Sequence, residues 1–193
     1  MNICVFGASN DAIDKINIET VEELCEKMAK RGQTLDFGGG NHGVMGASAR
    51  GEKRGGGKII GVVPSFFEVD GTIYPECDEC IYTETMRERK GIMEDKSDAF
   101  VIAPGGIGTY EEFFEVFTLK QLARHNKPIV IYNINGYYDA IIAALKTAEE
   151  QNFIRPLTLS LFEVFDDADK TIDYIENYVP QKIDIVKTRG LEN

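Results

Sequence analysis

Short runs of apolar residues recur along this chain, and between them lie longer segments whose apolar residues are three or four positions apart. The short runs, rich in Val, Ile and Phe, predict strands at 2–7, 33–37, 58–63, 79–83, 99–103, 128–133 and 161–165. The longer segments predict helices near 17–31, 43–54, 84–96, 109–124, 138–151 and 168–178. Most strand runs are continuously apolar rather than alternating, which indicates a sheet covered on both faces.

This alternation of strand and helix predicts an α/β fold. Right-handed crossovers would build a doubly wound, Rossmann-like three-layer sandwich with a mainly parallel sheet of about seven strands. With 193 residues and 43% hydrophobic content, we expect a single Rossmann-like nucleotide-binding domain at 1–180 and a C-terminal extension at 181–193. Ligands of such sheets bind at the carboxyl ends of the strands. Three glycine-containing turns follow predicted strands, so they should share one rim.

The most informative turn is 104–112, PGGIGTYEE, which joins the strand predicted at 99–103 to a helix. Its glycines, Gly105, Gly106 and Gly108, have no Cβ atom that would keep a ligand away from the backbone. Several N–H groups and the positive end of the next helix can therefore converge on an anion, and phosphate is the anion we expect.

Thr109 and Glu112 in this turn allow a second interpretation. They fit a capping box, in which Thr109 caps the helix and Glu112 reaches back to the Thr109 amide. A capping box explains these two residues without a catalytic role, but it gives no reason for the three glycines before them.

Two further turns lie nearer the N-terminus. Residues 38–46, GGGNHGVMG, match G-x-G-x-x-G at Gly38, Gly40 and Gly43, which raises a dinucleotide-binding fold. That fingerprint expects the first strand–helix turn and an acidic residue at the end of the next strand, whereas the next strand here ends without a carboxylate. The turn after the first strand contains Ser9, which can cap the turn or contact a ligand.

The segment 85–93, TMRERKGIM, places an arginine on an apolar stripe. Thr85 and Glu88 fit a capping box, and Arg89 then falls between two methionines at helical spacing. A guanidinium there is costly unless it is paired or faces a polar cavity, so Arg89 is either part of a structural ion pair or a site residue. Lys90 beside it can equally be a solvated surface charge.

Charge narrows the range of partners. The formal net charge of −11 argues against a nucleic acid polymer or an anionic membrane, because both require clustered Lys and Arg. The expected ligand is therefore a small molecule. The N-terminal residues lack the basic flank and long apolar region of a signal peptide, and no segment approaches the length of a membrane span, so we expect a cytoplasmic location.

The cysteines are expected to be free thiols in a reducing compartment. Only one pair has the CxxC spacing, and the two histidines are isolated in the sequence, so a tetrahedral zinc site would lack half its ligands. We therefore expect no metal site. The cysteines are Cys4, Cys25, Cys77 and Cys80.

Two linked motifs resemble the paired signature of the LOG (Lonely Guy) family. They are Met86-x-x-Arg89-Lys90 and the PGGxGTxxE pattern of 104–112, and the similarity extends over roughly residues 3–165. Members of this family are phosphoribohydrolases that release a free base from nucleoside 5′-monophosphates, notably cytokinin riboside monophosphates, and they are often mislabelled lysine decarboxylases. The resemblance implies hydrolysis of AMP or cytokinin riboside monophosphates to free base and ribose 5-phosphate, with no redox cofactor or metal.

The resemblance also implies roles for individual residues. Breaking an N-glycosidic bond builds positive charge on the ribose, which a carboxylate beside the anomeric carbon can stabilise. Glu112 would be this catalytic carboxylate, and Arg89 would hold the ribose phosphate or the departing base. The other implied residues bind substrate: Ser9, Gly39, Gly40, Gly43, Met86, Lys90, Gly105, Gly106, Gly108 and Thr109.

A homodimer is implied as well. The helix after Glu112 carries more apolar side chains than a single sheet-facing stripe requires, so part of that surface should meet a partner. The alternative is that all of these side chains belong to the core of one chain. They are Phe113, Phe114, Val116, Phe117 and Leu119.

Two other function classes remain open. One is a noncatalytic nucleotide- or cofactor-binding protein of the same fold, which would have no need of a carboxylate near an anionic ligand. The other is a dinucleotide-dependent oxidoreductase, which the missing ribose-binding acid disfavours. A pyridoxal-phosphate decarboxylase is disfavoured too, because no lysine stands in a context that explains a Schiff base.

Overall fold

The computed structural model describes residues 1–67, 71–180 and 183. The expected C-terminal extension, 181–193, lies outside the described residues apart from position 183. The described chain forms one sheet of seven parallel strands in the order β4-β3-β2-β1-β5-β6-β7. The strands are β1 (Asn2–Phe6), β2 (Thr34–Phe37), β3 (Lys58–Pro64), β4 (Glu79–Thr83), β5 (Ala99–Ile102), β6 (Ile129–Tyr132) and β7 (Glu163–Phe165).

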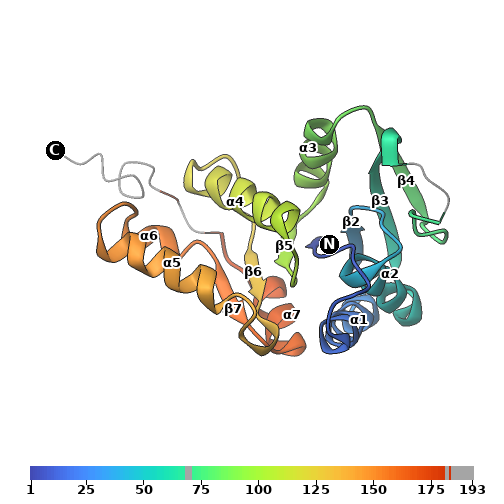
Figure 1. Ribbon diagram of the computed structural model, residues 1–193, viewed down its shortest axis with the longest axis horizontal. Helices are drawn as coiled ribbons and strands as arrows, with labels where there is room; N and C mark the ends of the chain where they lie inside the picture. Colours follow the sequence, from blue (N-terminus) through green and yellow to red (C-terminus); the bar gives the residue numbers. More distant parts are fainter. Residues whose placement is uncertain (68–70, 181–182, 184–193) are drawn as a thin grey trace.

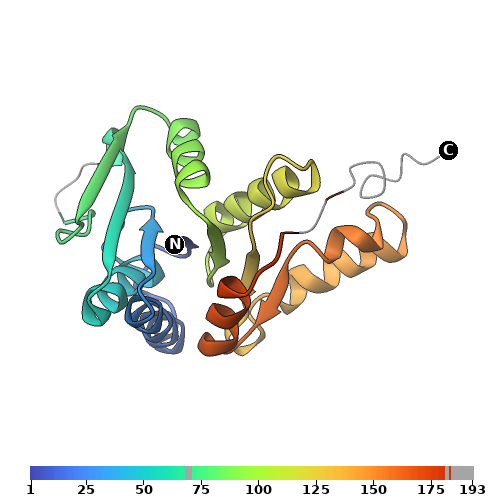
Figure 2. The same cartoon turned by 180° about the vertical axis from the view of Figure 1, so that it is seen from behind.

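Helices cover both faces of the sheet, as the continuously apolar strands require. In Figure 1 and, from behind, Figure 2, α3 and α4 lie on one side of the sheet and α1, α2 and α7 on the other. A hydrophobic core lies on each face of the sheet, and alternate residues of a strand point into opposite cores. In β1, Ile3 and Val5 face α1, α2 and α7, whereas Cys4 and Phe6 face α3, α4 and α5. The helices are α1 (Lys15–Lys30), α2 (Gly43–Gly55), α3 (Met86–Lys96), α4 (Ile107–Gln121), α5 (Asp139–Glu150), α6 (Pro156–Leu159) and α7 (Ala168–Glu176).

The predicted doubly wound architecture is confirmed. All seven predicted strands and all six predicted helices are present, with ends that shift by only a few residues. The sequence pattern did not predict the short α6 or the two 3₁₀ turns, Ser65–Phe67 and Ile134–Gly136, because one turn of helix leaves too few residues for a period to show.

The order of the strands reverses at β1. The chain runs outward from β1 through β2 and β3 to β4 on one side, and from β5 through β6 to β7 on the other. The helices that follow β1 and β5 therefore lie on opposite faces and leave a crevice between the strand ends. Backbone hydrogen bonds join the three glycine-containing turns at this edge, from the Ala8 N–H to Pro104 O (3.1 Å) and from the Met45 N–H to Ala8 O (3.0 Å). The expectation that the turns share one rim is confirmed.

Among the described residues, every helix is too short or too polar to cross a bilayer.

Candidate functional site

A cavity of about 530 Å³ opens at the point where the strand order reverses, a volume typical of small-molecule sites. The turns after β1, β2 and β5 line it together with the first turns of α3 and α4. The sequence-predicted residues that it brings together are Ser9, Gly39, Gly40, Met86, Arg89, Gly106, Gly108, Thr109 and Glu112. Three other predicted residues do not line it: Gly43, Lys90 and Gly105.

Arg89 and Glu112 form a buried ion pair in the wall of the cavity. The Arg89 Nη1–H donates to Glu112 Oε1 at 3.0 Å, and its Nε–H donates to the Val62 carbonyl at 3.1 Å. The two side chains are only 8% and 10% exposed. Burial raises the pKa of the Glu112 carboxyl, and the positive charge of Arg89 opposes that rise. The pair therefore presents a carboxylate of increased proton affinity beside a cation.

Local sequence explains why Arg89 reaches this position. Thr85 caps α3 and Glu88 reaches back to the Thr85 N–H, so the predicted capping box is confirmed. The helix therefore begins at Met86, which places Arg89 and the fully buried Met93 on its inner face. The two readings of Arg89, ion-pair member and site residue, both hold, since the same guanidinium pairs with Glu112 and lines the cavity.

The alternative interpretation of Thr109 and Glu112 as a capping box is wrong. The helix α4 begins at Ile107, two residues before the expected start, with Gly106 as a cap that makes no side-chain hydrogen bond. The three glycines let the chain enter the helix early, so Thr109 lies inside the first turn and Glu112 in the second. Glu112 is therefore too far along the helix to reach back, and its carboxylate pairs with Arg89 instead.

The N-terminus of α4 is an open anion site. Among the described residues, the N–H groups of Gly106, Ile107 and Gly108 have no hydrogen-bond partner, as expected for the uncapped start of a helix. A Cβ atom added to Gly106 or Gly108 would find no atom within 4 Å, so both glycines face open space. Gly105 lies behind them, because its Cβ would stand 2.1 Å from Thr109 Oγ1.

The N-terminus of α2, by contrast, is already occupied by a carboxylate of the protein. Asp11 Oδ1 accepts from the Gly43 N–H at 2.7 Å, and Asp11 Oδ2 lies 2.6 Å from His42 Nδ1. These hydrogen bonds, that from Gly43 first, lower the pKa of Asp11. Gly43 itself has φ +59° and packs against the backbone of Ala8, which explains the glycine without a ligand. Of these two helix ends, that of α4 is the one free to bind an anion.

Gly39 and Gly40 bring a further segment to the cavity. Gly39 has φ +75°, and its Cβ would lie 2.2 Å from Val63 Cγ2, so only glycine fits. The Tyr74 N–H donates to Gly39 O at 2.8 Å, and Gly40 pairs with Ile73 in an antiparallel bridge. The turn after β2 thus holds Ile73 against the cavity.

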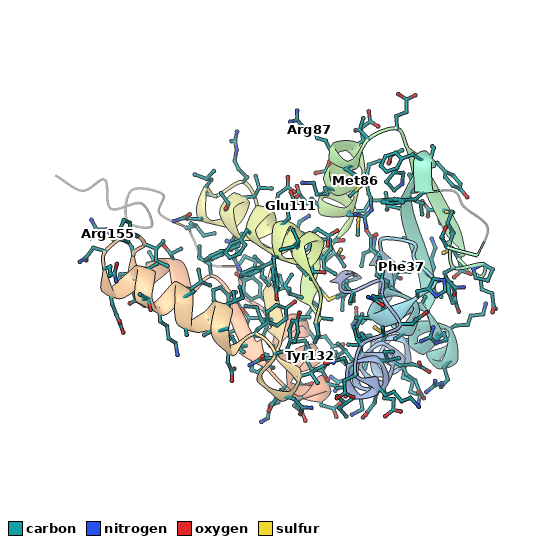
Figure 3. All side chains as sticks on the ribbon, viewed as in Figure 1. Phe37, Met86, Arg87, Glu111, Tyr132 and Arg155 are labelled. Carbon is teal, nitrogen blue, oxygen red and sulfur yellow. The ribbon has the colours of Figure 1, made fainter. Side chains whose placement is uncertain are left out.

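Lys90 is directed away from the cavity. Its ammonium pairs with Glu111 and, at 2.5 Å, with Glu115, both on α4. Figure 3 shows Glu111 on the side of α4 that faces α3, and Arg87 at the outer end of α3. Lys90 therefore ties α3 to α4 through ion pairs in which its side chain is only 16% exposed, so it is neither a solvated surface charge nor part of the cavity lining.

Sequence reasoning missed Gly38 as a site residue. It lines the cavity, and a Cβ at this position would lie 2.0 Å from Arg89 Nη2 and 3.2 Å from Arg89 Cζ. The guanidinium can reach Glu112 only because Gly38 has no side chain. His42, Phe67 and Ile73 also line the cavity, and no sequence motif marks them.

Comparison with known proteins adds independent findings. A family model described as "Possible lysine decarboxylase" matches residues 45–175. The chain is 38% identical over 181 residues to the probable cytokinin riboside 5′-monophosphate phosphoribohydrolase LOGL9 of Oryza sativa subsp. japonica, covering 92% of this chain and 78% of that protein. It is also 38% identical over 149 residues to the cytokinin riboside 5′-monophosphate phosphoribohydrolase of Mycobacterium tuberculosis, covering 77% of this chain and 80% of that one.

A solved structure supports the fold alone. The molybdenum cofactor carrier protein of Chlamydomonas reinhardtii superposes with a TM-score of 0.68 at 24% identity, covering 91% of this chain and 95% of that one.

The contact between Gly38 and Arg89 can be tested by Gly38→Ala. The added methyl group must displace the guanidinium or shift the backbone, so the free energy of unfolding should fall by about 1–3 kcal/mol. A crystal structure of the variant should show the Arg89–Glu112 hydrogen bond broken or lengthened. Gly91→Ala on α3 is the control, because no atom lies within 4 Å of its Cβ and alanine favours a helix. An unchanged ion pair and stability in Gly38→Ala would contradict the assignment.

Proposed function

We propose a substrate class for this chain, which belongs to the LOG family of phosphoribohydrolases and is an N-glycosidic hydrolase. The substrates are nucleoside 5′-monophosphates, either AMP or cytokinin riboside monophosphates. The products are the free base and ribose 5-phosphate. The observation that carries this proposal is the buried Arg89–Glu112 pair beside the uncapped N-terminus of α4 in one cavity. A phosphate at the helix end would bring its ribose toward the carboxylate.

Glu112 would act on the ribose and the attacking water. Cleavage of the N-glycosidic bond develops positive charge on the sugar ring, and a buried carboxylate stabilises that charge more strongly than an exposed one. Burial also raises the pKa of Glu112, which favours transfer of a proton from water as the water attacks. Arg89 favours the ionised form of the carboxylate and fixes it in place.

Arg89 would also contact the substrate. Among the described residues, its guanidinium uses one N–H for Glu112 and one for Val62 O, out of the five that an arginine offers. The remaining donors can bind the ribose phosphate or the departing base. The apolar side chains of Met86 and Phe67 also line the cavity, and a planar base can pack against them.

The 5′-phosphate would lie on the turn after β5. Three free amides, the positive end of α4 and the Thr109 side chain converge there, and Ser9 lines the cavity from the neighbouring turn. The phosphate supplies binding energy that holds the reacting bond in position against Glu112.

Two alternatives are weaker. A noncatalytic carrier of nucleotides or cofactors would gain nothing from a carboxylate beside an anion site, because the like charges repel. A lysine decarboxylase would require a lysine for a Schiff base with pyridoxal phosphate, and none of the described residues that line the cavity is a lysine.

A cytoplasmic location and a small-molecule partner belong to the same proposal. The described cysteines are all free thiols, which suits a reducing compartment. The net charge of −11 disfavours nucleic acid polymers and anionic membranes as partners.

Glu112→Gln should lower kcat for AMP by at least about 10²–10³-fold, because the amide keeps an oxygen for Arg89 but loses the negative charge. Free adenine and ribose 5-phosphate are measured by chromatography, and circular dichroism confirms the fold. Glu111→Gln is the matched control, since Glu111 lies next in sequence and pairs with Lys90 outside the cavity. Near wild-type turnover by the Glu112 variant would refute this mechanism.

Substrate choice tests the phosphate site. Nucleoside monophosphates should have kcat/KM values far above those of nucleosides, because only the phosphate can use the free amides of Gly106, Ile107 and Gly108. Steady-state kinetics with AMP and adenosine make the comparison. Equal kcat/KM for the two would exclude a phosphate-binding role for this turn.

Assembly is the remaining part of the proposal. Phe113, Val116 and Phe117 are buried in the core of the single chain, so they cannot form the expected partner surface. Phe114 is 38% exposed and Ile107 is 81% exposed on the same helix, and we propose that this smaller patch lies in a two-fold dimer interface. Light scattering should give twice the chain mass of 21.5 kDa. A fully active species of 21.5 kDa at micromolar concentration would exclude an obligate dimer.

A further inference from the structure

Two tyrosine hydroxyls hold carbonyl groups of the turn after β5. The Tyr138 O–H donates to Ala103 O at 2.7 Å, and the Tyr137 O–H donates to Gly105 O at 2.6 Å. A backbone hydrogen bond from Gly105 also reaches the Tyr138 phenol. Both tyrosines lie in the segment after β6, the strand next to β5, so the hydroxyls that bind this turn come from the adjacent strand–helix connection.

The other two carbonyls of this turn are also engaged by the protein. The Ala8 N–H donates to Pro104 O at 3.1 Å, and the Tyr110 N–H donates to Gly106 O at 3.0 Å. Four successive carbonyl groups, from position 103 to 106, therefore all accept hydrogen bonds. The N–H groups of Gly106, Ile107 and Gly108 have no such partner among the described residues. The turn is thus polarised: its four carbonyls are bound to protein, and the amides of Gly106, Ile107 and Gly108 are left for a ligand.

This polarity is not guaranteed by the glycines themselves. A glycine adopts positive and negative φ with similar ease, so a peptide plane next to Gly105 or Gly106 can rotate at little cost. Such a rotation would aim a carbonyl oxygen at the place where the anion binds, and the partial negative charge would repel it. Contacts from outside the turn must therefore hold these peptide planes. The Tyr137 hydroxyl holds the Gly105–Gly106 peptide through Gly105 O, and the Tyr138 phenol holds the Pro104–Gly105 peptide because it accepts from the Gly105 N–H.

The segment that carries the tyrosines is itself held in an uncommon conformation. Asn135 has φ +50° and Gly136 has φ +72°, in the left-handed region that asparagine and glycine adopt more readily than other residues. Asn133 fixes the end of this segment by accepting from the Tyr138 N–H at 2.7 Å and donating to Asp139 Oδ1 at 2.8 Å. These hydrogen bonds fix the backbone of the segment from which the two tyrosines reach the turn after β5.

We propose that Tyr137 and Tyr138 are positioning residues that set the peptide orientation of the anion-binding turn, and so the affinity for the substrate phosphate. The inference rests on the proposed function in one respect, that this turn holds the 5′-phosphate. Neither tyrosine lines the cavity, so neither contacts the substrate. Tyr138 is 1% exposed, so packing of its ring in the core would by itself account for a tyrosine there. Tyr137 is 44% exposed, so core packing does not account for it.

Tyr137→Phe and Tyr138→Phe test the proposal, because each keeps the ring and removes only the hydroxyl. Each variant should raise KM for AMP by on the order of 10-fold, with a much smaller change in kcat, since one hydrogen bond to the turn is lost. The kcat/KM for adenosine should not change, because adenosine has no phosphate. Tyr178→Phe is the control, as it loses a hydroxyl hydrogen bond to Asn126 (3.1 Å) away from the turn.

Equilibrium binding separates this inference from the proposed function. Isothermal titration with ribose 5-phosphate and with inorganic phosphate should show Kd raised on the order of 10-fold in both variants and unchanged in the control. This readout stands even if the wild-type protein does not hydrolyse AMP, which would overturn the proposed function alone. Equal phosphate affinity in the wild-type protein and both variants, or no phosphate binding by any of them, would overturn the role of the tyrosines. An equal loss of AMP and adenosine turnover would do the same, since it indicates general destabilisation.

Discussion

The buried ion pair between Arg89 and Glu112 is the constraint to which the rest of the site conforms. Removing two charges from water is costly, and that cost is recovered only if the pair is well aligned and its remaining hydrogen-bonding capacity is used. The Val62 carbonyl takes one further N–H of the guanidinium, and the bare backbone of Gly38 makes room for the group. Helix α3 supplies the cation and α4 the anion, so the pair also sets the distance between these two helices.

The strand reversal at β1 explains why charge of opposite sign can gather in one cavity. Of the helix N-termini at this edge of the sheet, the protein neutralises that of α2 with its own carboxylate, Asp11. That of α4, at Gly106, stays open to an anion. Glu112 lies in the same helix as that open end, and it is compatible with a bound anion because Arg89 compensates its charge. The open helix end and the carboxylate of Glu112 thus lie in successive turns of α4.

Supporting contacts extend outward from this arrangement. Lys90 joins α3 to α4 through Glu111 and Glu115, so it stabilises the orientation of the helices that carry the ion pair. Below the pair, Asp36 on β2 is fully buried, and burial raises its pKa to about 7 while Ser97 Oγ donates to it at 3.1 Å. Below neutral pH the Asp36 carboxyl is therefore largely protonated, and it then competes little with Glu112 for the positive charge of Arg89.

The sequence by itself determined the strands, the main helices, the parallel architecture and the glycine turn with its nearby glutamate, because apolar periodicity and glycine spacing are local properties of the chain. It also marked Arg89 as a charge in need of a partner. Only the tertiary structure decided that the partner is Glu112, that Lys90 is directed outward, and that Gly38 clears the way for the guanidinium. These contacts join residues far apart in the chain, and their geometry follows from how the helices pack on the sheet, which no local pattern of residues encodes.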